Sequence, residues 1–198
     1  MVNLIEICKK VNKHPSMVKG CYVFGSRIYQ TSNLESDWDI ILVANNSSVD
    51  VEYKVDNFNI HILTPDYFEK QLKDNHIRAI ECYFAPDWAI LKKYPIGFSL
   101  KKDSFRHNTS HIVSNSWIKS KKKIEQGDYY IGLKSLFHSL RIGLFSTHLI
   151  NKDFIDFTEA NYIWNDLISK EWTWDELNEK YRPIRNEIMS RFREVCEK

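Results

Sequence analysis

The sequence GSRIYQTSNLESDWDIILVA, residues 25–44, decides the fold of the amino-terminal half of the chain. It ends in a continuous apolar run that starts directly after Asp39, a pattern typical of a buried strand. It begins with Gly25-Ser26, which interrupts an apolar segment at residues 21–24 that we interpret as the preceding strand. Two strands joined by a polar loop indicate a sheet in this half.

Around this stretch, short apolar runs alternate with helical patterns, as they do where helices flank a sheet. The pattern predicts helices over 3–12 and 66–80, with strands over 49–55 and 58–63 on either side of Asp56-Asn57. From about Ser104 onward it predicts helices at 104–125, 129–150, 156–170 and 174–196. We therefore predict an α+β protein, in which a small mixed β-sheet core flanked by helices (1–100) is followed by an α-helical bundle (101–198).

Composition narrows the function classes. The 198 residues carry a net charge of only +2, whereas a dedicated nucleic-acid binder usually has a strong basic excess. The basic run Lys119–Lys123 is more typical of a solvated helix face. The four cysteines form no CxxC pair, which argues against a zinc site or a disulfide scaffold. With no secretion signal and no long apolar run, we expect a cytoplasmic protein without a membrane partner.

Two carboxylates and a phosphate-type turn lie close together in the sequence. Asp37 and Asp39 occupy alternate positions of the predicted strand, so their side chains point to one face while Trp38 points to the other. Paired carboxylates are suitable ligands for Mg²⁺, and two ions are possible at such a site. Gly25-Ser26, at the end of the preceding strand, can offer backbone N–H groups and a hydroxyl to a phosphate. These residues predict a site for a metal-bound phosphate group.

The combination of Gly25-Ser26-Arg27 with Ser36-Asp37-Trp38-Asp39-Ile40 resembles the DNA polymerase beta-like nucleotidyltransferase superfamily. More loosely, the whole chain resembles stand-alone predicted nucleotidyltransferases with a helical carboxy-terminal half, through the segment 81–86. The resemblance implies an enzyme that transfers NMP from a nucleoside triphosphate such as ATP to a hydroxyl of an RNA end, a protein or a small molecule. It also implies that Asp37 and Asp39 are catalytic metal ligands and that Gly25, Ser26 and Arg27 contact the nucleotide.

One expected feature of that superfamily, a third acidic residue on a neighbouring strand, is missing. The expected positions are Asn59 and His61, and neither is a carboxylate. His61 could act as a general base, although an ordinary strand histidine is the alternative interpretation. An acid of the preceding strand and turn could replace the missing group: Asp50, Glu52 or Asp56. The loss also supports a rival hypothesis, a catalytically impaired nucleotide-binding protein with a regulatory or antitoxin-like role.

A second cluster of polar residues falls on the predicted helix 129–150. Lys134, His138 and Arg141 are spaced i, i+4 and i+7 and therefore share one helix face. One interpretation is that they bind the triphosphate. The other is that they form structural ion pairs with acids such as Glu81 or Asp128, because unpaired buried charges are costly. An RNA-binding adaptor is a third hypothesis for the chain, and its near-neutral charge argues against it.

Overall fold

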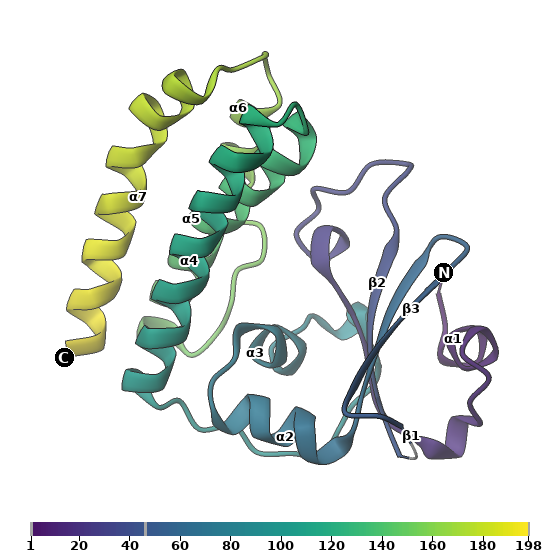
Figure 1. Ribbon diagram of the computed structural model, residues 1–198. Coiled ribbons are helices and arrows are strands. Elements are labelled where there is room, and N and C mark those ends of the chain that lie inside the picture. Colours follow the sequence, from purple (N-terminus) through teal and green to yellow (C-terminus); the bar gives the residue numbers. More distant parts are fainter. Residues whose placement is uncertain (1, 46, 198) are drawn as a thin grey trace. The chain divides into compact units, whose positions relative to one another are not determined.

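The computed structural model describes residues 2–45 and 47–197, and the chain divides into two compact units, Met1–Lys101 and Lys102–Lys198. The first unit contains a mixed sheet flanked by helices, and the second is helical throughout its described elements (Figure 1). The predicted α+β class with a helical carboxy-terminal region is confirmed. In the described residues, no helix combines the length and apolar character needed to cross a membrane.

The sheet of the first unit has the strand order β3-β4-β2-β1-β5. The central strands β2 and β4 are parallel, and the other neighbours are antiparallel. Helix α1 lies on one face of the sheet, and α2 and α3 lie on the other (Figure 1). The elements are α1 (Leu4–Lys10), β1 (Val18–Phe24), β2 (Trp38–Ala44), β3 (Asp50–Val55), β4 (Phe58–Leu63), α2 (Pro65–Lys73), α3 (Ile77–Tyr83) and β5 (Ile90–Lys92), with short 3-10 turns at η1 (Pro15–Met17), η2 (Gly25–Arg27) and η3 (Asp87–Ala89).

The helix predicted over 66–80 is two helices, α2 and α3. Between them Asn75 adopts a positive φ of 55°, a conformation that asparagine tolerates better than most residues. Its buried side-chain amide donates hydrogen bonds to the carbonyls of Leu72 and Ser99, at 3.0 and 3.1 Å, and its oxygen accepts one from the backbone N–H of Lys101 at 2.6 Å. The side chain of Asn75, at the break between the helices, therefore fixes the last residues of the first unit.

The second unit consists of α4 (Lys102–Glu125), α5 (Tyr129–Lys152), α6 (Asn161–Leu167) and α7 (Trp174–Glu197). Its core is built mainly from α5, α6 and α7, with buried Leu136, Leu140, Trp164 and Leu167 among its members. Helix α6 is shorter than the predicted 156–170. The carboxylate of Asp156 accepts hydrogen bonds from both the backbone N–H and the hydroxyl of Thr158, at 2.9 and 2.8 Å, and this local turn competes with a helix.

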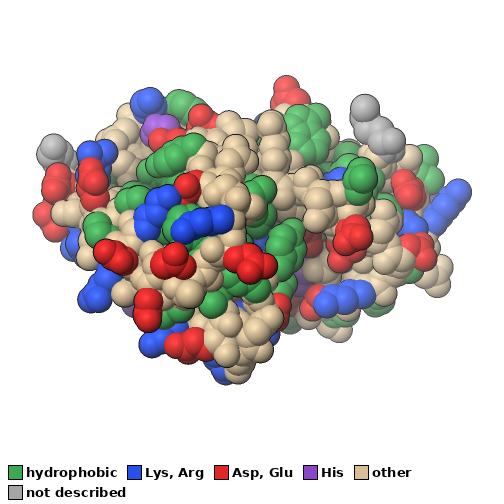
Figure 2. Space-filling model, turned by 90° about the horizontal axis from the view of Figure 1, so that it is seen from above, with side chains coloured by type: hydrophobic (Ala, Val, Ile, Leu, Met, Phe, Trp, Pro, Cys, Tyr) green, Lys and Arg blue, Asp and Glu red, His purple; other side chains and the backbone are tan. Residues whose placement is uncertain are grey.

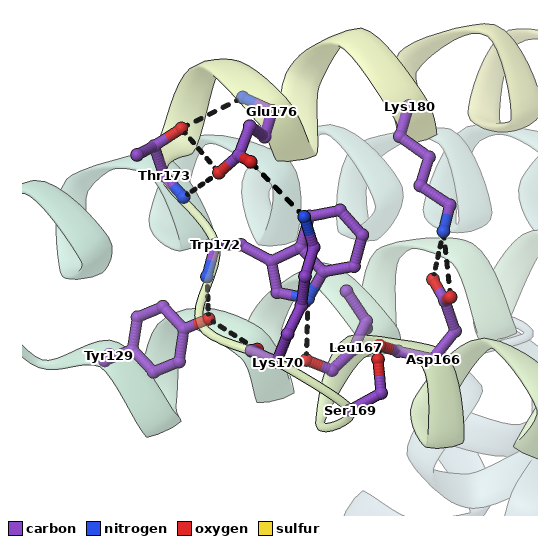
Figure 3. A network of polar contacts seen from close by, with 9 residues as sticks. All are labelled: Tyr129, Asp166, Leu167, Ser169, Lys170, Trp172, Thr173, Glu176 and Lys180. Carbon is purple, nitrogen blue, oxygen red and sulfur yellow. Dashed lines mark hydrogen bonds and ion pairs between the residues drawn. The ribbon is translucent and has the colours of Figure 1, made fainter.

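The segment between α6 and α7 is ordered by polar contacts (Figure 3). The backbone N–H of Trp172 donates to the hydroxyl of Tyr129 at 2.6 Å, and its indole N–H donates to the carbonyl of Leu167 at 3.0 Å. Thr173 and Glu176 form a reciprocal capping box at the start of α7: the backbone N–H of Thr173 donates to the carboxylate at 2.7 Å, and that of Glu176 donates to the threonine hydroxyl at 3.2 Å. These contacts fix where α7 begins.

Both edges of the sheet are protected. Edge strand β3 exposes Asp50, Glu52 and Lys54, so that charges alternate along it. The opposite edge strand, β5, has only three residues.

Candidate active site

The glycine corner lies directly against one of the two predicted carboxylates. Strand β1 ends at Phe24, which is the partner of Asp39 in the antiparallel β1–β2 ladder. Gly25 then opens η2 with a positive φ of 73°. A Cβ added to Gly25 would lie 2.3 Å from Oδ2 of Asp39, far closer than such contacts allow. Only glycine combines this backbone conformation with this approach of the carboxylate.

Asn59 lies beside the same carboxylate. It is the partner of Asp39 in the parallel β2–β4 ladder, and its side-chain amide donates to Oδ1 of Asp39 at 3.3 Å. The amide oxygen of Asn59 is buried and has no hydrogen-bond partner among the described residues. A buried acceptor without a donor is uncommon, and it marks a place where a ligand, an ion or a water is expected.

Asp37 lies immediately before β2 with its side chain exposed. Arg27 holds this segment: its Nε donates to the backbone carbonyl of Asp37 at 3.2 Å, and its terminal nitrogen donates to the carbonyl of Ser36. The guanidinium also stacks on the ring of Trp38, at 4.0 Å from the ring centroid. Because successive strand residues point to opposite faces, this stack places Arg27 on the side of β2 away from the Asp39 carboxylate. The guanidinium of Arg27 is thus bonded to the backbone of residues 36 and 37, and Ser26 beside Arg27 is half-buried.

His61 shares the Asp39 face of the sheet, two residues further along β4 than Asn59. Its Nδ1 lies 3.8 Å from Oδ1 of Asp50, and its ring packs edge-on against Phe24 with the centroids 6.0 Å apart. The other oxygen of Asp50 accepts a hydrogen bond from Arg78 at 2.8 Å. The imidazole is therefore held between an anchored carboxylate and the strand that leads to the glycine corner.

The acids considered as replacements for the missing carboxylate have other neighbours. Asp50 is bonded to Arg78, and Asp56, in the β3–β4 turn, pairs with Lys10 at 2.7 Å. Glu52 is the ladder partner of His61 rather than of Asn59. The residue opposite Asn59 on β3 is Lys54, a cation. Among the described residues, no three histidine, cysteine, aspartate or glutamate side chains gather to hold a metal ion.

The predicted stripe on α5 lies in the second unit. A terminal nitrogen of Arg141 and Nδ1 of His138 are 2.9 Å apart, so the neutral imidazole accepts a hydrogen bond from the guanidinium. Burial, followed by the charges of Arg141 and Lys119, lowers the pKa of His138 to about 3. Lys134 lies over the ring of Tyr130, with its Nζ 4.7 Å from the centroid. His138 therefore acts as an uncharged support for Arg141.

Each of the two acids considered as structural partners for this stripe makes a contact within its own unit. Asp128 pairs with Lys123 at 2.9 Å, and Glu81 accepts a hydrogen bond from the hydroxyl of Tyr29 at 2.8 Å.

The surface charge matches the balanced composition. Acidic and basic side chains are interspersed over the face of the molecule seen in Figure 2. Within the run Lys119–Lys123, Lys121 pairs with Glu125 at 3.7 Å and Lys123 pairs with Asp128 at 2.9 Å. Two of the four lysines of this run are therefore partly neutralised, which weakens the positive surface that a phosphate backbone requires.

No model of a known protein family matches the chain, and no curated protein matches it. Among solved structures, the chain is similar to the nucleotidyltransferase-like protein from Exiguobacterium sibiricum 255-15. The identity is 12%, the match covers 98% of this chain and 73% of that chain, and the TM-score is 0.31. At that TM-score the similarity establishes neither a fold nor a function.

Proposed function

We propose that the first unit binds a nucleoside triphosphate with Mg²⁺ at the Gly25-Ser26 corner and transfers its nucleotidyl group to a hydroxyl acceptor. The proposal rests mainly on one observation, the close approach between Gly25 and the Asp39 carboxylate. That approach brings a turn of the phosphate-binding type next to an oxygen ligand for a hard cation.

The residues around the corner fit Mg²⁺, which prefers oxygen ligands and keeps open positions for substrate phosphates. The carboxylates of Asp37 and Asp39 supply two such ligands. The partnerless amide oxygen of Asn59 is an uncharged oxygen beside them. When bound, Mg²⁺ supplies charge neutralisation at the phosphates, which lowers the barrier to in-line displacement.

The residues of the corner and of the neighbouring strand divide the work of binding and proton transfer. The backbone N–H groups of the corner and the hydroxyl of Ser26 hold the phosphates, and Arg27 keeps the Asp37 segment in place. His61, whose Nδ1 lies 3.8 Å from the Asp50 carboxylate, accepts the proton of the attacking hydroxyl as a general base. The acceptor is a hydroxyl of an RNA end, a protein or a small molecule.

A second function, nucleotide binding without transfer, is favoured by the pairing of Asn59 with Lys54. An amide in place of a carboxylate leaves the metal with less compensating charge, and a cation in the same row opposes a further metal ion. This chain would then sense or sequester nucleotides.

Binding is tested first, by thermal unfolding with ATP, CTP, GTP or UTP, with and without Mg²⁺. Nucleotide at ten times its dissociation constant stabilises a protein by about 1.4 kcal/mol, which raises the Tm of a chain of this size by about 3–6 °C. We expect that rise only with Mg²⁺, in the wild type and in the control Asp87→Asn, which removes one exposed charge elsewhere in the unit. It should vanish in Asp39→Asn. A rise that survives in Asp39→Asn, or that needs no metal, would refute the site.

Transfer is tested next, with α-labelled nucleotide and RNA, protein and small-molecule acceptors. Labelling of an acceptor by the wild type, lost in Asp39→Asn, supports transfer. Binding without label supports the second function, and in that case Asn59→Asp, which restores a carboxylate, should produce label transfer.

The prediction that Lys134, His138 and Arg141 contact the triphosphate is tested in the same thermal assay. Lys134→Met removes a charge from a half-buried position on α5. A wild-type thermal shift in that variant would remove Lys134 from the binding set.

A further inference from the structure

A cavity of about 500 Å³ lies in the second unit, between α5, α7 and the segment that leads into α6. This volume is in the range that holds small organic ligands. It is separate in sequence from the glycine corner, since its lining residues run from Leu144 to Val195. Part of its wall is apolar, formed by Leu144, Ile184, Ile188 and Val195.

The polar part of the wall contains a histidine–carboxylate pair. Nδ1 of His148 lies 2.8 Å from Oε2 of Glu159, and both side chains are largely buried. The two atoms are paired with each other at this distance, and neither has a further hydrogen-bond partner in the described part of the chain. The ring of Phe154 packs against the imidazole, with the centroids 5.8 Å apart. A carboxylate can accept several hydrogen bonds, so Glu159 keeps acceptor capacity for a ligand in the cavity.

Burial disfavours the ionised form of Glu159, so a further cation beside this carboxylate would be stabilising. Burial raises the pKa of Glu159, and the nearby Asp156 raises it further, while His148 and Lys152 lower it. Lys152 lies over the ring of Phe154, 5.9 Å from the centroid.

The other cation in the wall is already paired, since Arg191 lies 2.5 Å from Glu187. Glu194 adds a third carboxylate to the wall, beside Glu159 and Glu187, against the two cations Lys152 and Arg191. With His148 as a neutral imidazole, the wall is therefore short of one positive charge.

We propose that this cavity binds an amphipathic organic cation, with its ammonium group on Glu159 and its apolar body against Leu144, Ile184 and Ile188. The same charge balance disfavours phosphates and other anions, so the ligand is not the nucleotide of the first unit. The inference does not depend on the function proposed for the glycine corner.

Three probes of similar size but different charge test the inference directly: 2-phenylethylamine, 2-phenylethanol and 3-phenylpropionate. Each is titrated into the full ¹⁵N-labelled chain, and binding is followed by NMR shifts of cavity residues. We expect the amine to bind about tenfold more tightly than the alcohol, as one charge-assisted hydrogen bond in a partly buried site provides. The carboxylate should not bind. No shifts with the amine, or equal affinity for all three probes, would overturn the proposal.

Two matched variants test whether Glu159 is the carboxylate that binds the ammonium group. Glu159→Gln keeps the size of the side chain and should reduce the preference for the amine over the alcohol to about twofold or less, while binding of the alcohol is retained. Glu171→Gln removes a carboxylate from an exposed position outside the cavity wall and should leave the preference unchanged. The dispersion of the spectrum reports folding in both variants. An unchanged preference in Glu159→Gln would refute the assignment of the ammonium site.

Discussion

Replacing Gly25 with alanine tests the geometry on which the proposed nucleotide site depends. The left-handed backbone at φ 73° makes any side chain unfavourable by about 1 kcal/mol. The new Cβ would also lie 2.3 Å from Oδ2 of Asp39, so the carboxylate must turn away. An off-rotamer side chain costs about 1 kcal/mol, and losing the hydrogen bond from Asn59 costs about 1 kcal/mol more. We therefore expect Gly25→Ala to lower the free energy of unfolding by about 3 kcal/mol.

The chain offers a matched control for this change. Gly127 has a φ of 80° with no atom within 4 Å of an added Cβ, so Gly127→Ala should cost only the backbone contribution of about 1 kcal/mol. Urea unfolding, followed by tryptophan fluorescence and circular dichroism, measures both variants. In an Asp39→Ala background the cost of Gly25→Ala should fall to about 1 kcal/mol, a coupling of about 2 kcal/mol. Equal costs for Gly25→Ala and Gly127→Ala would mean that the carboxylate does not lie against the corner.

Three further predictions concern the second unit. The pKa of His138 is lowered to about 3, so below the ordinary value near 6.5 the unfolded state binds a proton that the folded state does not. The free energy of unfolding should therefore fall by about 1 kcal/mol per pH unit in that range. Urea midpoints measured at about pH 7 and about pH 5.5 should decline less in His138→Asn than in the wild type. Trp172→Phe leaves the buried carbonyl of Leu167 without its donor and should destabilise by about 1–3 kcal/mol, measured by urea unfolding against the exposed control Ile168→Val. Gly143→Ala places a Cβ 2.5 Å from Cγ2 of Ile188 and should lower the free energy of unfolding by about 1–3 kcal/mol. Adding Ile188→Ala to that variant should restore part of the loss, because it removes the clashing side chain.

The elements that the sequence predicts well are those with a long, regular pattern. The apolar run after Asp39 gives β2, and the long helical periodicities give α4, α5 and α7 within two residues at each end. The break between α2 and α3 was missed because it depends on Asn75, whose side chain binds Ser99 far along the sequence. The three-residue strand β5 was missed for a related reason: it is a strand only because it pairs with β1.

The geometry of the candidate site, like the secondary structure, is only partly predictable from the sequence. The spacing of Gly25 and Asp39 predicts a shared corner, because neighbouring antiparallel strands bring the end of one to the start of the next. The two-residue Asp56-Asn57 turn would have given the register of Lys54 opposite Asn59, since a tight hairpin fixes its own pairing. The contact of Arg27 with the carbonyls of Ser36 and Asp37 could not be predicted, because it depends on how the loop between the strands folds.

The two edges of the sheet restrict how this protein can associate with itself. Strand addition needs a long, flat edge with free backbone groups, and proteins prevent it by placing charges along an edge strand or by shortening it. The first unit does both: β3 exposes Asp50, Glu52 and Lys54, and β5 is only three residues long. Growth of the sheet into fibrils or strand-swapped pairs is therefore disfavoured from either side, even at the high concentrations reached during expression.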